Sequence, residues 1–274
     1  MPLSRTYTTP AAPSTIQPAS TTTGKAALRR PFSGGIRAIA LILTSVISAA
    51  SAQGPPENLA RLVAHRESQT EAERNQYLYR QTVTIDELDD RGAVRGQYKE
   101  VRDIIFSPAQ ERTEESVGKP LNSLKNLIMT PEDFRDIRDI QPLVLTEDRL
   151  WNYETRFKGE ETVDGVDCWV LQVRPRQILG DLRFFDGLVW VDKKEYNIIR
   201  MQGQAVPQIH SLKQENLFPR FTTLRKAVDG EHWFPVYTYA DDTLHFRTGP
   251  QRERLRIAYS NYKRFGVEST FRPK

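Results

Sequence analysis

Cysteine is almost absent from this chain. Cys168 is the only one among 274 residues, so no disulfide can form within the chain, and stability has to come from a hydrophobic core. Cys168 lies within Val166–Val173, on the strand face opposite Trp169 and Leu171. We expect a small buried side chain there, because a reactive thiol needs an exposed, electropositive site.

Long apolar runs are also missing. The longest, Ile36–Ile47, has about 12 residues, and a transmembrane helix needs about 20. The pair Arg29-Arg30 precedes this run and the small residues Ala50-Ser51-Ala52 follow it, an order that predicts a secretory leader cleaved between Ala52 and Gln53. We therefore expect an exported, periplasmic protein with residues 1–52 comprising a disordered N-terminal region and a signal peptide, and 53–274 forming one domain.

The export route has two candidates. We expect the Sec route, while Phe32, placed one residue after the arginine pair and Pro31, fits a twin-arginine signal. No cysteine lies directly after the apolar run, where a lipid-modified cysteine would stand, so we do not expect the protein to be a lipoprotein itself.

An excess of positive charge is missing once the leader is removed. The chain has 39 Lys and Arg against 35 Asp and Glu, and five of the basic residues but no acidic ones lie in the leader. Removing those five leaves 34 against 35, so the mature chain offers no basic surface by composition. We expect no nucleic-acid partner.

Catalytic and metal-binding motifs are missing as well. The four histidines are scattered, and neither a zinc-binding His pair nor a G-x-S-x-G or phosphate-binding loop occurs. Asp241-Asp242 lies close before His245 but fits a solvated turn, and Ser260 to Lys263 matches S-x-x-K at the end of a strand instead of the start of a helix. We expect no enzyme activity, no cofactor and no metal.

What the sequence has in quantity is β-strands. The central stretch Arg183–Val206 consists of two apolar arms joined at 192–195. In the first arm, the residues at even and at odd positions are both apolar, so we expect neither face of this strand to be fully exposed to solvent. Other alternating runs, several joined at Asp-Gly turns, are 77–88, 98–107, 111–117, 151–162, 166–174, 221–228, 232–240 and 254–264.

Helical patterns are few. We expect an amphipathic helix over 56–69, a weak one over 121–129, and a clearer start at Thr130, where Pro131 and two acidic residues follow the capping threonine. The predicted fold is mainly β (α+β), a strongly curved antiparallel sheet that forms an incomplete barrel with short helices against its concave face. We expect a monomer.

The run Gly187–Lys193, GLVWVDK, followed by Ile198-Ile199-Arg200, resembles the hairpin of outer-membrane lipoprotein-sorting proteins of the LolA family. The resemblance implies a half-barrel whose apolar lumen shelters acyl chains under a helical lid, without a metal or a reaction. It implies lipid or an acylated lipoprotein as the partner, with the membrane lipoprotein machinery around it.

Aromatic strand residues are the candidates for the lining of such a lumen. They are Tyr79, Trp151, Trp169, Phe184, Trp190 and Tyr237, with Phe218 and Phe221 at the rim. The alternative is a non-catalytic envelope scaffold or interaction module whose own side chains fill the interior. An open apolar cavity distinguishes the carrier from that scaffold.

Overall fold

The computed structural model describes residues 54–107, 111–140, 142, 145–180, 182–210 and 215–265. The predicted leader and its cleavage site at Ala52 and Gln53 lie outside the described residues. Within the described ranges, no helix is long and apolar enough to cross a membrane.

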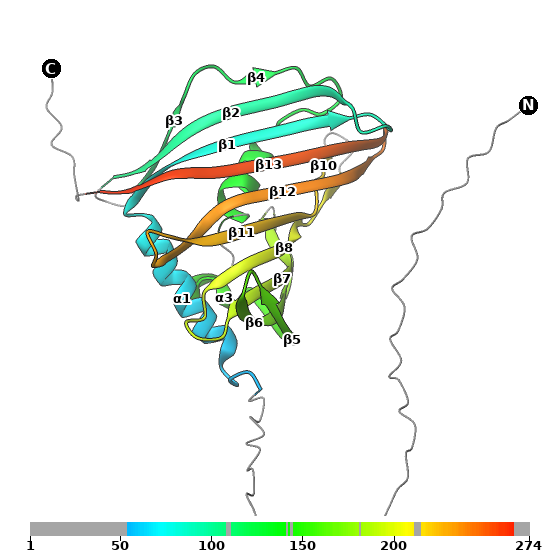
Figure 1. Cartoon of the computed structure of the whole chain (residues 1–274). Coiled ribbons are helices and arrows are strands. Elements are labelled where there is room, and N and C mark those ends of the chain that lie inside the picture. Colours follow the sequence, from blue (N-terminus) through cyan, green and yellow to red (C-terminus); the bar gives the residue numbers. More distant parts are fainter. Residues whose placement is uncertain are drawn as a thin grey trace, which may run out of the picture. The chain divides into compact units, whose positions relative to one another are not determined.

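One large antiparallel sheet contains almost all the strands (Figure 1). Its order is β3-β2-β1-β13-β12-β11-β8-β7-β6-β5, with β4 also paired to β2. The strands are β1 (Tyr77–Leu88), β2 (Val94–Phe106), β3 (Arg112–Ser116), β4 (Leu121–Asn122), β5 (Tyr153–Val163), β6 (Val166–Pro175), β7 (Phe184–Asp192), β8 (Ile198–Val206), β11 (Phe221–Val228), β12 (His232–Phe246) and β13 (Gly249–Arg264). A separate two-stranded ribbon pairs β9 (Ile209–His210) with β10 (Glu215–Asn216).

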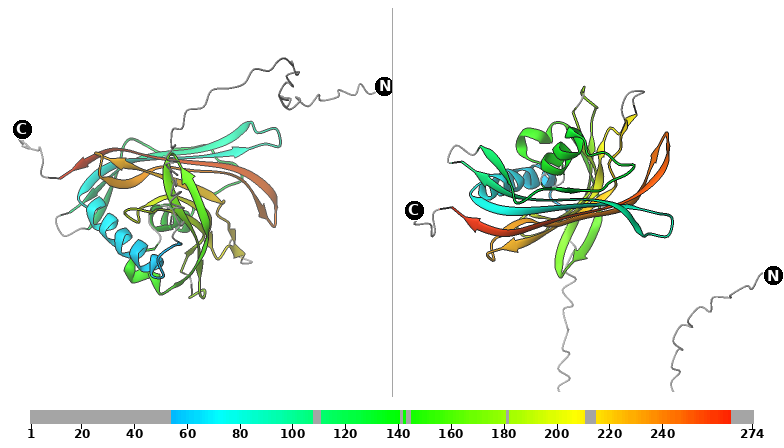
Figure 2. Two further views of the ribbon diagram at one scale, coloured as in Figure 1. Left: turned by 60° about the horizontal axis from the view of Figure 1, so that its bottom comes forward. Right: turned by 90° about the horizontal axis from the view of Figure 1, so that it is seen from above.

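The sheet curves strongly and its two edges, β3 and β5, do not pair (Figures 1 and 2). The helices lie on its concave side: α1 (Leu59–Arg74), α2 (Pro131–Arg135), the π-helix η1 (Asp136–Ile140) and α3 (Glu147–Leu150). The predicted fold class is confirmed. The N-terminal meander and the long C-terminal meander are joined where β1 pairs with β13, so the last strand is central rather than closing an edge.

The predicted turn and cap chemistry is present. Asp164, Gly165, Asp229 and Gly230 all have positive φ, as two-residue hairpin turns require. Thr130 caps α2 in a capping box with Asp133. The prediction of a weak helix over 121–129 was wrong. Leu121 and Asn122 pair with β2 and form β4, and the rest of this stretch is irregular.

The central hairpin packs around one ring. Phe185 is fully buried, and Gly187 and Gly203 face each other across β7 and β8 beneath it. A Cβ at Gly187 would lie 2.6 Å from the Phe185 ring, and one at Gly203 equally close. The glycine that opens the motif Gly187–Lys193 is therefore needed for close packing.

A buried ion pair fixes α1 to the sheet. Arg225 of β11 donates from both terminal nitrogens to the Glu67 carboxylate, at 2.5 and 2.9 Å, and also to the Pro142 carbonyl. The two side chains are 0% and 1% exposed. Such a bidentate pair fixes the position of the helix more than it adds stability.

The convex face of β5–β8 carries a second, smaller apolar cluster. It contains Val163, Cys168, Val170, Trp190 and Ile199. Cys168 is fully buried, and burial raises the pKa of its thiol to about 11. The cysteine is a packed side chain, as predicted. Strand β7 contributes to both clusters, with Phe184, Phe185, Val189 and Val191 in the larger one and Trp190 in the smaller.

Candidate ligand-binding cavity

A cavity of about 710 Å³ lies at the end of the sheet where β12 turns into β13. Its floor comes from β1, β12 and β13, and its other walls are residues 126–130 and 215–219. Most of its lining side chains are apolar: Ile85, Leu127, Ile128, Met129, Leu217, Phe218, Pro219, Leu244, Phe246 and Pro250. The volume is within the range of small-ligand sites, about 300–1,000 Å³.

One wall is an irregular segment, residues 123–130, which we term the covering loop. Glu87 of β1, fully buried, accepts backbone N–H groups from Lys125 at 2.8 Å, Asn126 at 2.6 Å and Leu127. Its cross-strand partner Gly96 leaves room for the loop, because a Cβ there would lie 2.7 Å from the Ser123 carbonyl oxygen. A single carboxylate therefore holds three consecutive loop residues over the cavity.

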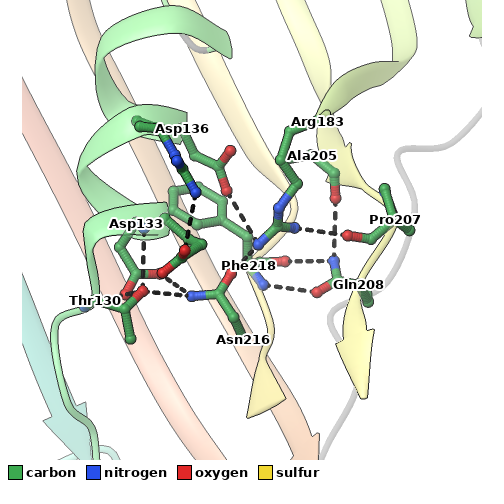
Figure 3. Close-up of polar contacts among 11 residues, drawn as sticks. Thr130, Asp133, Asp136, Arg183, Ala205, Pro207, Gln208, Asn216 and Phe218 are labelled. Carbon is green, nitrogen blue, oxygen red and sulfur yellow. Dashed lines mark hydrogen bonds and ion pairs between the residues drawn. The ribbon is translucent and has the colours of Figure 1, made fainter. Parts of the chain in front are cut away.

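A polar cluster joins the two irregular walls (Figure 3). Asn216 donates from its amide to Thr130 Oγ1 and to Asp133 Oδ1, both at 2.9 Å, and accepts from Arg183. Asp133 also accepts the backbone N–H of Thr130 at 2.7 Å. Helix α2 and its cap Thr130 are thereby tied to β10.

Arg183 and Gln208 extend the same cluster (Figure 3). Arg183 donates to the Pro207 carbonyl at 2.8 Å and pairs with Asp136 of η1 at 3.4 Å. Gln208 donates to the Phe218 carbonyl and accepts the Phe218 N–H, at 3.0 and 2.8 Å. Phe218 is thus positioned by a side-chain amide on the rim of the cavity.

Three carboxyl groups line the cavity, and their surroundings differ. Glu215 accepts the Arg247 N–H at 3.0 Å, and such contacts lower its pKa despite burial. Burial raises the pKa of Asp133, although its hydrogen bonds with Thr130 and Asn216 act to lower that pKa. Glu253 is 7% exposed, and burial raises its pKa to about 8, with Asp133, Asp242 and Glu87 adding to the shift.

A second cavity, of about 320 Å³, lies beside η1 and is lined by Phe184, Tyr153, Arg149, Arg183 and Asp136. Burial raises the pKa of Asp136 to about 7, although Arg183 opposes the shift. This space is less than half the size of the first, and most of the residues that line it are charged or polar.

The structure places the predicted lining residues in several different environments. Phe218 lines the large cavity, and Phe221 packs beneath it at 6.3 Å between ring centroids without reaching the cavity. Phe184 lines the small cavity. Tyr79 and Trp169 are buried in the main core, where their own neighbours fill the space.

The other three candidates lie away from the concave interior. Trp190 pairs across the sheet with Val170, whereas Trp169 pairs with Val191, so the two tryptophans face opposite sides. Trp190 donates to Glu161 at 2.7 Å, and Arg200 lies 3.7 Å above its ring. Tyr237 stacks on the exposed Tyr239, and Trp151 is 63% exposed after α3.

The carboxylates of the Asp241, Asp242 and His245 candidate are occupied by other partners. Asp241 binds Arg252 and Arg254 at 3.0 and 2.7 Å, and the Asp242 carboxylate accepts the Arg220 N–H. Among the described residues, no group of His, Cys, Asp and Glu is arranged to hold a metal ion.

No family model matches the sequence, and no curated protein matches it either. Solved structures do resemble it. A DUF1329 family protein from Desulfovibrio piger covers 79% of this chain and 96% of its own, at 15% identity and a TM-score of 0.37. A LolA superfamily protein from Nitrosomonas europaea covers 76% and 94%, at 16% identity and a TM-score of 0.36.

A third resemblance is to an outer membrane lipoprotein-sorting protein domain from Vibrio parahaemolyticus. It covers 75% of this chain and 93% of its own, at 11% identity and a TM-score of 0.34. Two of these three proteins have the family names that the central hairpin predicts. At these identities and TM-scores the likeness says nothing of function, for which this chain's own residues are the evidence.

Apart from Phe218, the residues that build the large cavity were not predicted from the sequence. Glu87 shares the inward parity of Tyr79, Val83 and Ile85, and Glu253 shares that of Leu255 and Ile257. An acidic residue at an inward strand position is a signal that the sequence alone offered. Asn216 and Arg183 gave no such signal, because their partners lie far away in the chain.

Proposed function

We propose that the protein is a carrier that binds an acyl chain of a lipid or lipoprotein in the 710 Å³ cavity, in the periplasm and without performing a reaction. The observation that supports this most is a cavity of ligand size in which 10 of the 19 lining residues are apolar. Each CH₂ group moved from water into such a site contributes about 0.8 kcal/mol. A cavity of this kind can therefore hold part of an alkyl chain.

A carrier must also release its ligand, and the covering loop is suited to open for this release. The backbone N–H groups of residues 125–127 donate to one carboxylate, and Ile128 at the cavity is 82% exposed. A wall without regular secondary structure opens at lower cost than a strand. Loading and unloading through this wall would leave the sheet intact.

The scaffold alternative is supported by the other part of the concave face. Tyr79, Trp169 and Phe185 are 7% exposed or less, and side chains of the chain itself fill the space around them. If the protein were only an interaction module, the large cavity would bind no lipid.

The test is ligand binding by the purified protein. Native mass spectrometry should find co-purifying lipid, and the neutral dye Nile red should bind and be displaced by dodecanol. Leu244→Trp, which fills the cavity from β12, should weaken dye binding by about tenfold or more.

The matched control is Tyr239→Trp, on the same strand at a position that is 44% exposed. It should bind dye as the parent does. Absence of both co-purified lipid and dye binding in the parent would reject the carrier function and leave the scaffold.

A further inference from the structure

The large cavity has an uneven charge. Its described lining includes the carboxyl groups of Asp133, Glu215 and Glu253 but no Lys, Arg or His side chain. Two of the three have protein partners: Asn216 and Thr130 for Asp133, and, for Glu215, His210 together with the backbone N–H and the guanidinium group of Arg247. Negative charge at this site is therefore only partly balanced by the protein.

Glu253 is the exception. Its side chain has no hydrogen bond or ion pair with any described residue, although it is 7% exposed and lines the cavity. Buried polar groups almost always have a partner, and one without is a place where a ligand can supply it. Its cross-strand neighbours are Glu87 on β1 and Asp242 on β12, so no cation lies beside it on either side.

We propose that this cavity binds an amphiphile with an ammonium group at its polar end, and that Glu253 is the residue that binds this group. The inference rests on the proposed function, since the alkyl part must enter the same apolar cavity. The proposal specifies the chemical class of the ligand's polar group, which the apolar part of the lining does not determine.

The electrostatic reason is the same field that acts on Glu253 itself. Burial is the main reason that ionisation of Glu253 is unfavourable, and the nearby carboxyl groups of Asp133, Asp242 and Glu87 add a negative potential at its carboxyl group. A fatty-acid carboxylate or a phosphate placed there meets that potential without a cation to pair with. An ammonium group is attracted by it and supplies the missing hydrogen-bond donors.

Binding should move a proton. At pH 7 the Glu253 carboxyl group is mostly protonated, because its pKa is about 8. When the ammonium binds, the carboxyl O–H bond breaks, its proton goes to the buffer, and the ammonium N–H groups donate to the carboxylate that remains. The affinity for an ammonium ligand should therefore rise by up to about tenfold per pH unit towards pH 8, and then level off.

The experiment is titration calorimetry of the whole protein with dodecylammonium, dodecanol and dodecanoate. It is done at pH 7 in two buffers of different ionisation enthalpy, and repeated at pH 6 and 8. We expect dodecylammonium to bind at least about tenfold more tightly than dodecanoate, with release of close to one proton. The pH series needs no variant, so it tests the proposal even if a substitution impairs folding.

Glu253→Gln should abolish both the preference and the proton release while leaving dodecanol binding in place. The control Glu231→Gln, at an exposed turn, should retain both. Equal binding of dodecanoate, or a preference that survives in Glu253→Gln, would overturn the ammonium proposal alone. Failure of dodecanol to bind would overturn the carrier function, and the ammonium proposal with it.

Discussion

The two ends of the β1–β13 pair are formed by the same two strands and are filled in opposite ways. At one end aromatic rings close the space: Tyr79 and Tyr262 stack at 5.1 Å between centroids, and Phe234 packs on Tyr77 and Tyr262. At the other end the inward positions carry Glu87 and Glu253, opposite each other, and the 710 Å³ cavity lies there.

The difference shows what keeps a cavity open. Aromatic side chains collapse onto one another because each contact removes apolar surface from water. Two carboxyl groups side by side cannot do so, and Glu87 is instead hydrogen-bonded to the covering loop. The open end is therefore less stable than it would be with apolar residues, which is expected of a site that binds a ligand.

The largest expected effect lies on the closed side. Glu67→Ala leaves Arg225 buried without its carboxylate partner and should lower the free energy of unfolding by about 3–5 kcal/mol. Glu71→Ala, one turn further along α1 and half-buried, should cost less than about 1 kcal/mol. Urea unfolding measures both, and equal losses would show that the ion pair does not anchor the helix.

At the open end, Glu253 should make stability depend on pH. Its folded-state pKa of about 8 exceeds the usual 4.5, so its contribution is fully present below pH 4.5 and is lost as pH rises towards 8. Glu253→Gln should match the parent at pH 4.5 and become more stable by at most about 1.4 kcal/mol per pH unit above it. Thermal unfolding across this range tests the difference, and parallel curves for the two proteins would contradict it.

A matched pair of aliphatic truncations compares the two ends directly. Ile257→Ala, fully buried in the main core, should cost about 2–5 kcal/mol through lost contacts and a new void. Leu244→Ala should cost about 1–2 kcal/mol, since one side of Leu244 already faces the cavity. Denaturant unfolding gives both values, and a larger loss at Leu244 would mean that the cavity is filled by protein in solution.

The smallest effect should come from the support of the covering loop. Gly96→Ala places a Cβ against Ser123 O and the Glu87 carboxylate, and should cost about 1 kcal/mol while speeding exchange of the loop amides. Gly118→Ala is the comparison, at a glycine that has nothing within 4 Å but has positive φ. Hydrogen exchange at the amides of residues 125–127 should become faster in Gly96→Ala and stay unchanged in Gly118→Ala. Unchanged exchange in Gly96→Ala would show that the contact of Glu87 with the loop does not limit its opening.

Much of the fold could be predicted because its signals are local. Strand β1 was expected over the same residues that the structure shows, and the Asp-Gly turns and the cap at Thr130 were read from neighbouring residues. The cavity could not be predicted in this way. Of the eight aromatic candidates only Phe218 lines the large cavity, since their inward or outward direction depends on cross-strand register.

The sequence by itself determined which stretches form most of the long strands, where the Asp-Gly turns lie and that β7 is apolar on both faces, because each of these depends on residues within a few positions of one another. The tertiary structure alone decided that Trp190 faces away from Trp169 and that Glu253 lies beside Glu87. Both outcomes depend on pairing between strands far apart in the chain. A shift of one residue in such a pairing would exchange the two faces.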